Sequence, residues 1–75
     1  PLIKTIDSIK IYVYLRDHLP PHFHVLYSEF EELVEIRTLM TYSGYVPIRQ
    51  RRRVIAWAEK NKNFIMKKWL EFNPA

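Results

Sequence analysis

The chain has no cysteine and only one glycine among its 75 residues. The lack of cysteine excludes disulfide bridges and thiolate metal sites. No apolar run approaches the roughly 20 residues that a membrane-spanning helix needs. The N-terminus also lacks the basic head and apolar stretch of a secretory signal. We therefore expect a cytoplasmic protein that does not interact with a membrane.

Apolar residues are plentiful, at 48% of the chain, and include two Trp, four Phe and five Tyr. A chain of this length buries only about 60–65% of its unfolded surface, so its core is thin. The apolar content is nevertheless too high for a disordered chain. We expect residues 1–75 to form a single domain.

Alternating apolar and polar residues predict an antiparallel sheet in the first half of the chain. The predicted strands are 2–6, 9–16, 22–27 and 31–38. The pattern is clearest in IKIYVYLR, the second of these segments. Pro20 and Pro21 then remove two N–H donors and make a stiff, extended connection. The segment 39–46, which contains Gly44, reads as a loop.

From Pro47 onward the apolar spacing becomes helical, with steps of three and four residues as far as Phe72. Proline suits the first turn of a helix. Either one helix over 47–72 or two helices with a break near 61–63 fits, because Asn caps helices and disfavours their interiors. The predicted fold is α+β, a small antiparallel sheet of three or four strands with this helix packed on one face.

The sheet face opposite the helix is predicted to gather basic, aromatic, imidazole and carboxylate groups. Its members are Lys10, Tyr12, Tyr14, Arg16, His22, His24, Glu35 and Arg37. Each also has an ordinary structural interpretation. Exposed tyrosines pack on cross-strand neighbours, and a surface pair between Glu35 and Arg37 contributes little. The composition of this face is therefore compatible with a site but does not require one.

One functional interpretation of this face is RNA cleavage without a cofactor. Imidazole titrates near neutral pH, so the two histidines of the third strand are candidates for acid and base. An arginine would hold the phosphate, and the tyrosines would stack bases. The candidate catalytic residues are His22, His24, Glu35, Arg37 and Arg16. The candidate RNA-binding residues on the same face are Lys10, Tyr12 and Tyr14.

A second interpretation is a metal site made by His18, His22 and His24, the three histidines of DHLPPHFHV. His22 and His24 are two residues apart on a strand and face the same way, and Asp17 would add an oxygen ligand. His18 is separated from them by the stiff segment 19–21 and need not converge. Three histidines without cysteine are a weak zinc signature, and His18 also suits a structural hydrogen bond to a loop carbonyl.

A third interpretation is a non-catalytic binding module, because the charge of +4 is unevenly distributed. Residues 45–75 hold eight Lys or Arg and two Glu, a net charge of +6. Such a block suits nucleic acid or an acidic partner, although it also suits a solvated helix face. The candidate contacts are Arg51, Arg52, Arg53, Lys60, Lys67 and Lys68.

The run DHLPPHFHV, the hairpin with EELVEIRT, the step GYVP and the segment VIAWAEKNKNFIMKKW together resemble a bacterial family called domain of unknown function 4160. The residues that match its signature run are Asp17, His18, Pro20, Pro21, His22, Phe23 and His24. Members are typically encoded beside a protein of the family called domain of unknown function 2442. The resemblance implies the toxin component of a type II toxin–antitoxin pair, with the neighbouring protein as cognate antitoxin.

The sequence departs from the family pattern at several positions. Ser28 replaces a glycine that follows the hairpin tyrosine, Val46 replaces a leucine, and Lys68 replaces an asparagine. Asn61 stands where the family often has a histidine in the helix. The strand histidines His22 and His24 are therefore the favoured catalytic candidates. The resemblance assigns no catalytic residue. The short strand 2–6 is a candidate exposed edge for pairing with another chain, so a homodimer is a further option.

Overall fold

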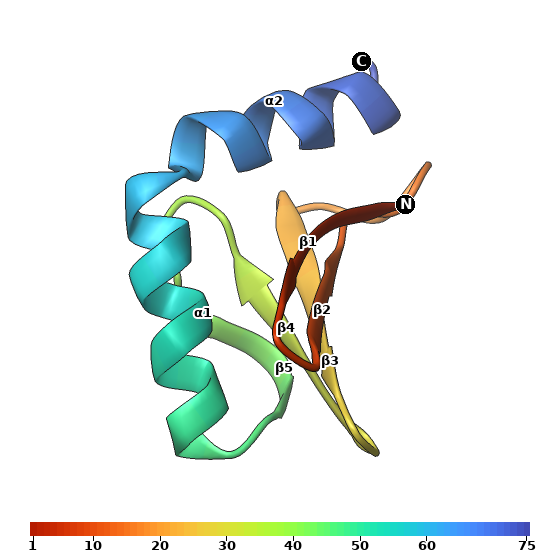
Figure 1. Cartoon of the computed structure of the whole chain (residues 1–75). Helices are drawn as coiled ribbons and strands as arrows, with labels where there is room; N and C mark the ends of the chain where they lie inside the picture. The colour runs from red at the N-terminus through yellow and green to blue at the C-terminus, as the bar shows by residue number, and fades with distance from the viewer.

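The structure is a computed structural model of residues 1–75, with five strands and two helices (Figure 1). The elements are β1 (Leu2–Ile6), β2 (Ile9–Tyr12), β3 (His22–Tyr27), β4 (Phe30–Glu35), β5 (Thr41–Tyr45), α1 (Ile48–Lys60) and α2 (Lys62–Phe72). The strands form one antiparallel sheet in the order of the sequence. This confirms the α+β class, with one strand more than expected. Neither helix is long and apolar enough to cross a membrane.

The second strand is shorter than the predicted segment 9–16. The chain leaves the ladder after Tyr12, and Arg16 takes a left-handed conformation with φ of 53°. A non-glycine residue in this region marks a turn. The end of the alternating segment therefore belongs to a loop, which runs from β2 to β3 and contains Asp17.

The segment 39–46 was expected to be a loop, but residues 41–45 form the edge strand β5 beside β4. Gly44 has φ of +72°, and a Cβ added to it would lie 2.2 Å from the carbonyl oxygen of Glu31. Only glycine permits this close approach. All five residues of β5 are exposed, so the strand lacks the alternation of buried and exposed residues by which strands are recognised.

The helical half of the chain is two helices rather than one, and Asn61 separates them. Its φ of −132° leaves the helical region, and its side-chain Nδ2 donates to the carbonyl of Trp57 at 2.8 Å. The break lies inside the predicted range 61–63. The chain changes direction at this break, so α1 lies along the sheet while α2 crosses one end of it (Figure 1).

Both helices contribute to a single apolar core with one face of the sheet. The buried apolar residues are Ile9, Ile11, Val13, Phe23, Val25, Val34, Ile36, Leu39, Val46, Val54, Ala58, Ile65 and Trp69. The alternation in β2 and β3 places Ile9, Ile11, Phe23 and Val25 on this face, as predicted. We call the opposite face, which carries Tyr12 and His24, the open face.

One charged group, the carboxylate of Glu32, is buried on the core side. It accepts hydrogen bonds from Arg51 Nε at 2.8 Å, from Thr41 Oγ1 at 2.6 Å and from the N–H of Val46 at 3.1 Å. A buried carboxylate is tolerated only when it is paired in this way. The contacts of Glu32 therefore hold α1 and β5 against β4.

Candidate functional site

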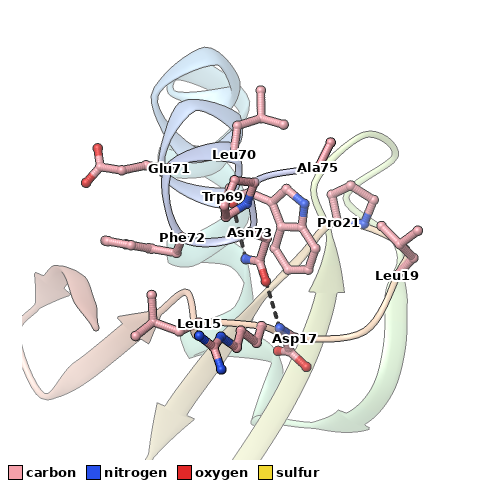
Figure 2. Close-up of a pocket in the computed structure, with 12 residues that line it drawn as sticks. Leu15, Asp17, Leu19, Pro21, Trp69, Leu70, Glu71, Phe72, Asn73 and Ala75 are labelled. Atoms are coloured by element: carbon pink, nitrogen blue, oxygen red, sulfur yellow. Dashed lines mark hydrogen bonds between the residues drawn. The ribbon is translucent and has the colours of Figure 1, made fainter.

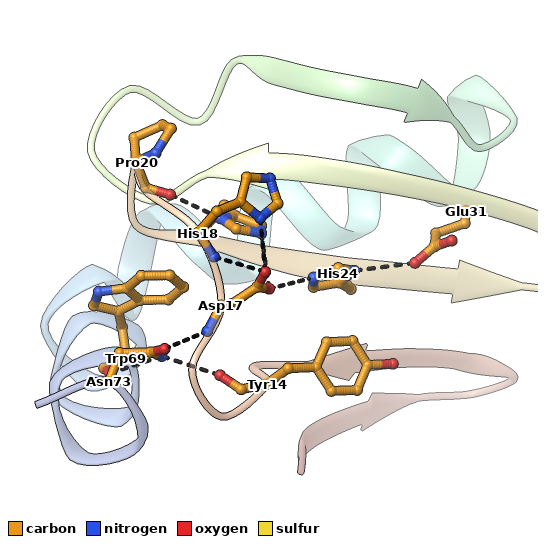
Figure 3. A network of polar contacts seen from close by, with 9 residues as sticks. Tyr14, Asp17, His18, Pro20, His24, Glu31, Trp69 and Asn73 are labelled. Atoms are coloured by element: carbon orange, nitrogen blue, oxygen red, sulfur yellow. Dashed lines mark hydrogen bonds and ion pairs between the residues drawn. The ribbon is translucent and has the colours of Figure 1, made fainter.

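The candidate site is a cluster of Asp17, His22 and His24, which we call the histidine–aspartate cluster. Asp17 Oδ2 lies 3.0 Å from His22 Nε2 and 2.9 Å from His24 Nε2 (Figure 3). The other carboxylate oxygen, Oδ1, accepts hydrogen bonds from the backbone N–H and the ring of His18, at 2.9 and 2.8 Å. One carboxylate therefore contacts all three histidines of the chain.

The position of Asp17 is set by the end of α2. Its backbone N–H donates to Asn73 Oδ1 at 2.7 Å, and Asn73 Nδ2 donates to the carbonyls of Tyr14 and Trp69 at 3.0 and 3.1 Å (Figures 2 and 3). In addition, the N–H of Arg16 donates to a carbonyl at the end of α2. These bonds hold the loop between β2 and β3 against the end of the helix.

His22 lies at the start of β3 and is fully buried, with 0% of its surface exposed. Its ring packs near Trp69 and Tyr42, with centroid distances of 5.3 and 5.5 Å. Nδ1 donates to the carbonyl of Pro20 at 2.7 Å. Nε2 is buried and makes no hydrogen bond, although it lies close to Asp17. This nitrogen is the single buried side-chain polar atom without a hydrogen-bond partner.

His24 follows two residues later, so its ring points to the same side of the strand. Its side chain is 12% exposed. Nε2 donates to Asp17, and Nδ1 donates to Glu31 Oε2 at 3.0 Å (Figure 3). Its ring and the ring of Tyr14 are roughly perpendicular, at a centroid distance of 4.5 Å, and Tyr14 stacks on Tyr12 at 5.6 Å. Two tyrosines and the accessible histidine therefore form one continuous aromatic surface.

The surroundings shift two pKa values in the site. Burial by itself raises the pKa of Asp17, but the hydrogen bonds from His24 and His18 outweigh it and lower this pKa to about 2. Burial raises the pKa of the Tyr14 hydroxyl, and the nearby carboxylate of Glu31 raises it further. At neutral pH Asp17 is therefore an anion and Tyr14 keeps its proton.

Residues 8–70 match the family described as Domain of unknown function (DUF4160). The chain belongs to this family. The matched range includes the whole histidine–aspartate cluster, Glu31 and Trp69. No curated protein and no solved structure matches the chain significantly. Family membership therefore agrees with the resemblance seen in the sequence.

Three of the five residues predicted to be catalytic make no polar contact with the cluster. Glu35 pairs with His22 in the sheet register, but its carboxylate accepts a hydrogen bond from Thr38 Oγ1 at 2.8 Å. Arg37 is exposed beyond the end of β4, and Arg16 is exposed in the loop before Asp17. None of these three side chains makes a hydrogen bond or an ion pair with the cluster.

The basic residues predicted to bind nucleic acid also differ in whether they have an acidic partner within the chain. Arg51 is used internally, because it pairs with Glu32 and donates to the carbonyl of Leu39. Arg53 pairs with Asp7. Arg52 is exposed and makes no ion pair. Of these three arginines, therefore, Arg52 alone has no acidic partner within the chain, and binding of a phosphate backbone by residues 51–53 stays a prediction.

Two residues of the site were underestimated from the sequence. Asp17 was expected only as an additional oxygen ligand, yet it is the centre of the cluster. The sequence pattern did not indicate Glu31 as a site residue. The register pairs His24 with Leu33, and Glu31 is two residues from Leu33 on the same strand and face. The signal for Glu31 was therefore the register of the hairpin, because diagonal neighbours on one face are within reach of long side chains.

A groove of about 800 Å³ lies beside the loop that carries Asp17. Figure 2 shows its apolar lining, which comes from the loop on one side and the end of α2 on the other. The apolar residues that line it include Leu15, Leu19, Trp69, Leu70 and Phe72. Apolar surface therefore lies directly next to the polar cluster.

Proposed function

We propose that the protein acts on RNA, as the toxin component of a bacterial toxin–antitoxin pair, through its open face. The observation that carries this proposal is the continuous surface of Tyr12, Tyr14 and His24. The two tyrosine rings are nearly parallel, with an angle of 12° between their planes, and the ring of His24 is roughly perpendicular to that of Tyr14. Tyr12 and His24 are register partners on the sheet face opposite the core, and Figure 1 shows the helices on the other side of the sheet.

The tyrosine pair supports RNA rather than double-stranded DNA as the target. Bases that are not paired stack on aromatic side chains of exposed sheets, and each such contact contributes about 1–3 kcal/mol. A base stacked on Tyr14 would bring its phosphate next to His24. The hydroxyl of Tyr14 is protonated at neutral pH, so it can donate a hydrogen bond to that phosphate.

The burial of the histidines distinguishes their roles in this proposal. His24 is partly exposed and can contact a substrate, whereas His22 is fully buried behind it. Asp17 and Glu31 contact the two ring nitrogens of His24 and hold the ring in one orientation. In a reactive imidazole one ring nitrogen is oriented by a carboxylate and the other exchanges a proton with the substrate, so the phosphate would displace one of these two carboxylates from His24. Direct contact with RNA is therefore proposed for His24 and not for His22.

The toxin role rests on the family's gene neighbourhood, which resembles a toxin–antitoxin operon. The proposed partner is an antitoxin of the domain of unknown function 2442 type, bound over the open face. We place both proteins in the bacterial cytoplasm, where their RNA target would be. Binding of nucleic acid by the basic helices is a weaker alternative, because Arg51 and Arg53 already have acidic partners within the chain.

The test is induced expression in a bacterium, with growth and total RNA followed over the next hour. Four proteins are compared: wild type, His24→Ala, the double variant Tyr12→Ala/Tyr14→Ala, and Tyr45→Ala as a control. Tyr45 is an exposed tyrosine on β5, which β3 and β4 separate from β2. We expect growth arrest and RNA loss with wild type and Tyr45→Ala only. Arrest of equal strength with His24→Ala and with the double variant would refute the proposal.

A further inference from the structure

We propose that Asp17, His22 and His24 bind a divalent transition-metal ion, an inference that holds whether or not the protein acts on RNA. The three donor atoms are Asp17 Oδ2 and the Nε2 atoms of both histidines, and all lie within 4.8 Å of one another. Donors that surround a zinc ion tetrahedrally at 2.0–2.1 Å lie roughly 3.3 Å apart. The two nitrogen-to-oxygen distances, 3.0 and 2.9 Å, need to open by only a few tenths of an ångström.

The strongest support is the unpartnered Nε2 of His22. A carbonyl oxygen only accepts hydrogen bonds, so the contact with Pro20 places a hydrogen on Nδ1 of His22. In the neutral ring, Nε2 then presents a lone pair toward Asp17, which offers no hydrogen in return. An unsatisfied buried polar atom costs about 1–3 kcal/mol. A metal ion between His22 and Asp17 would give this lone pair a partner.

The outer contacts of the three ligands have the form that metal sites use. Metal-binding histidines usually donate their second ring N–H to a carbonyl or a carboxylate, which fixes the tautomer and the ring orientation. His22 donates to the Pro20 carbonyl and His24 to the carboxylate of Glu31. Asp17 Oδ1 is held by two donors of His18. Each ligand is therefore oriented by an atom outside the set of three donors.

The donor set also indicates which ions fit. Two imidazole nitrogens and one carboxylate oxygen suit Zn²⁺ and Fe²⁺, and such sites keep a coordination position open. The partial exposure of Asp17 and His24 lets a water molecule or a phosphate oxygen reach that position. The ion would take the place of the hydrogen on His24 Nε2, and that proton would leave to solvent. Its charge would also offset Asp17 and Glu31, which otherwise repel phosphate.

The experiment measures binding of Zn²⁺ by calorimetry and of Co²⁺ by its visible absorption, using full-length protein first stripped with EDTA and dialysed. We expect one ion per chain. Loss of an outer contact to a metal ligand costs about 10–100-fold in affinity, so we expect this range for Glu31→Gln. Loss of a ligand should cost more, so we expect a decrease of at least about 100-fold for Asp17→Asn and for His24→Gln.

Two further variants test the identity of the ligands. Glu29→Gln makes the same carboxylate-to-amide change in the exposed β3–β4 turn, and its affinity should equal that of wild type. His18→Gln should lower the metal affinity by no more than Glu31→Gln does, because His18 contacts only the second oxygen of Asp17. Circular dichroism checks that every variant is folded.

The proposal is overturned if wild type binds neither ion at one per chain, or if Asp17→Asn and His24→Gln bind as wild type does. It is also overturned if His18→Gln loses as much affinity as His24→Gln, since the ligand set would then be a different one. A protein that binds the ion but leaves cellular RNA intact would support the metal site and refute the proposed function. The two proposals can therefore fail separately.

Discussion

The side chain of Asn73 accepts a hydrogen bond from the backbone N–H of Asp17 at 2.7 Å, although the two residues are 56 positions apart. Through the same amide group, Asn73 also donates to the carbonyls of Tyr14 and Trp69. It therefore joins the end of α2 to the loop that carries the central carboxylate of the cluster. Asn73, at the end of the last helix, therefore positions a cluster whose three residues lie in the first third of the chain.

Replacing Asn73 with Ala should destabilise the protein by about 1.5–4.5 kcal/mol, because three partly buried hydrogen bonds are lost and each contributes about 0.5–1.5 kcal/mol. The free energy of unfolding in urea measures this. Asn63→Ala is the matched control, since Asn63 is exposed on α2 and its side chain makes no hydrogen bond. That variant should be as stable as wild type or slightly more stable, because Ala favours helix. Equal stability of Asn73→Ala and wild type would contradict the prediction.

Replacing Arg51 with Ala should destabilise the protein by about 3–5 kcal/mol, because it leaves the carboxylate of Glu32 buried without its cation. Chemical denaturation measures the change. Arg52→Ala is the control: it removes the same charge from the same helix at an exposed position without an ion pair, and it should change stability by less than about 0.5 kcal/mol. If the two variants are equally stable, the buried pair does not anchor α1.

Replacing Gly44 with Ala should destabilise β5, because the added Cβ would collide with the carbonyl of Glu31 and the backbone has φ of +72°. The left-handed conformation alone costs about 1–2 kcal/mol in a residue with a side chain, and the collision adds to it. Hydrogen exchange of the β4–β5 amides, together with thermal unfolding, measures the effect. Ser43→Ala, next to it on the exposed strand, should leave both unchanged. Wild-type exchange in Gly44→Ala would contradict the structure of this edge.

Removal of metal should lower thermal stability if the cluster binds an ion in the folded state only. An ion present at 100 times its dissociation constant stabilises the folded state by about 2.7 kcal/mol. We therefore expect added Zn²⁺ to raise the melting temperature of EDTA-treated wild type, and EDTA to reverse the rise. His24→Gln should show no such rise. An equal increase in that variant would show that Zn²⁺ stabilises the fold from another place.

Much of the fold could be predicted from local patterns. The alternation in residues 9–13 identified the face of Ile9, Ile11 and Val13 that is buried in the core. The helical spacing was also visible in the sequence, but the choice between one helix and two helices with a break near 61–63 was left open. The edge strand β5 was missed, because its residues are all exposed and carry no periodic pattern. Its place depends on pairing with β4, which the sequence does not display.

Some features of the candidate site could also be predicted from the sequence, and others could not. The spacing of His22 and His24 predicted that both rings point to one side of a strand, and both contact the same oxygen of Asp17. The burial of His22 could not be predicted, because the residues that cover it include Trp69 of α2. The use of Arg51 inside the fold was also hidden, since its partner Glu32 lies on a strand 19 residues earlier.

The sequence by itself determined the strand and helix periodicities, the absence of thiol chemistry and the concentration of histidine in one short run. These are local properties, since each depends on residues within a few positions of one another. The tertiary structure alone decided which histidine is accessible, which carboxylate lies between the rings and which arginines already have partners. Those outcomes depend on contacts such as that between Asp17 and Asn73, which form only when the helices close against the sheet.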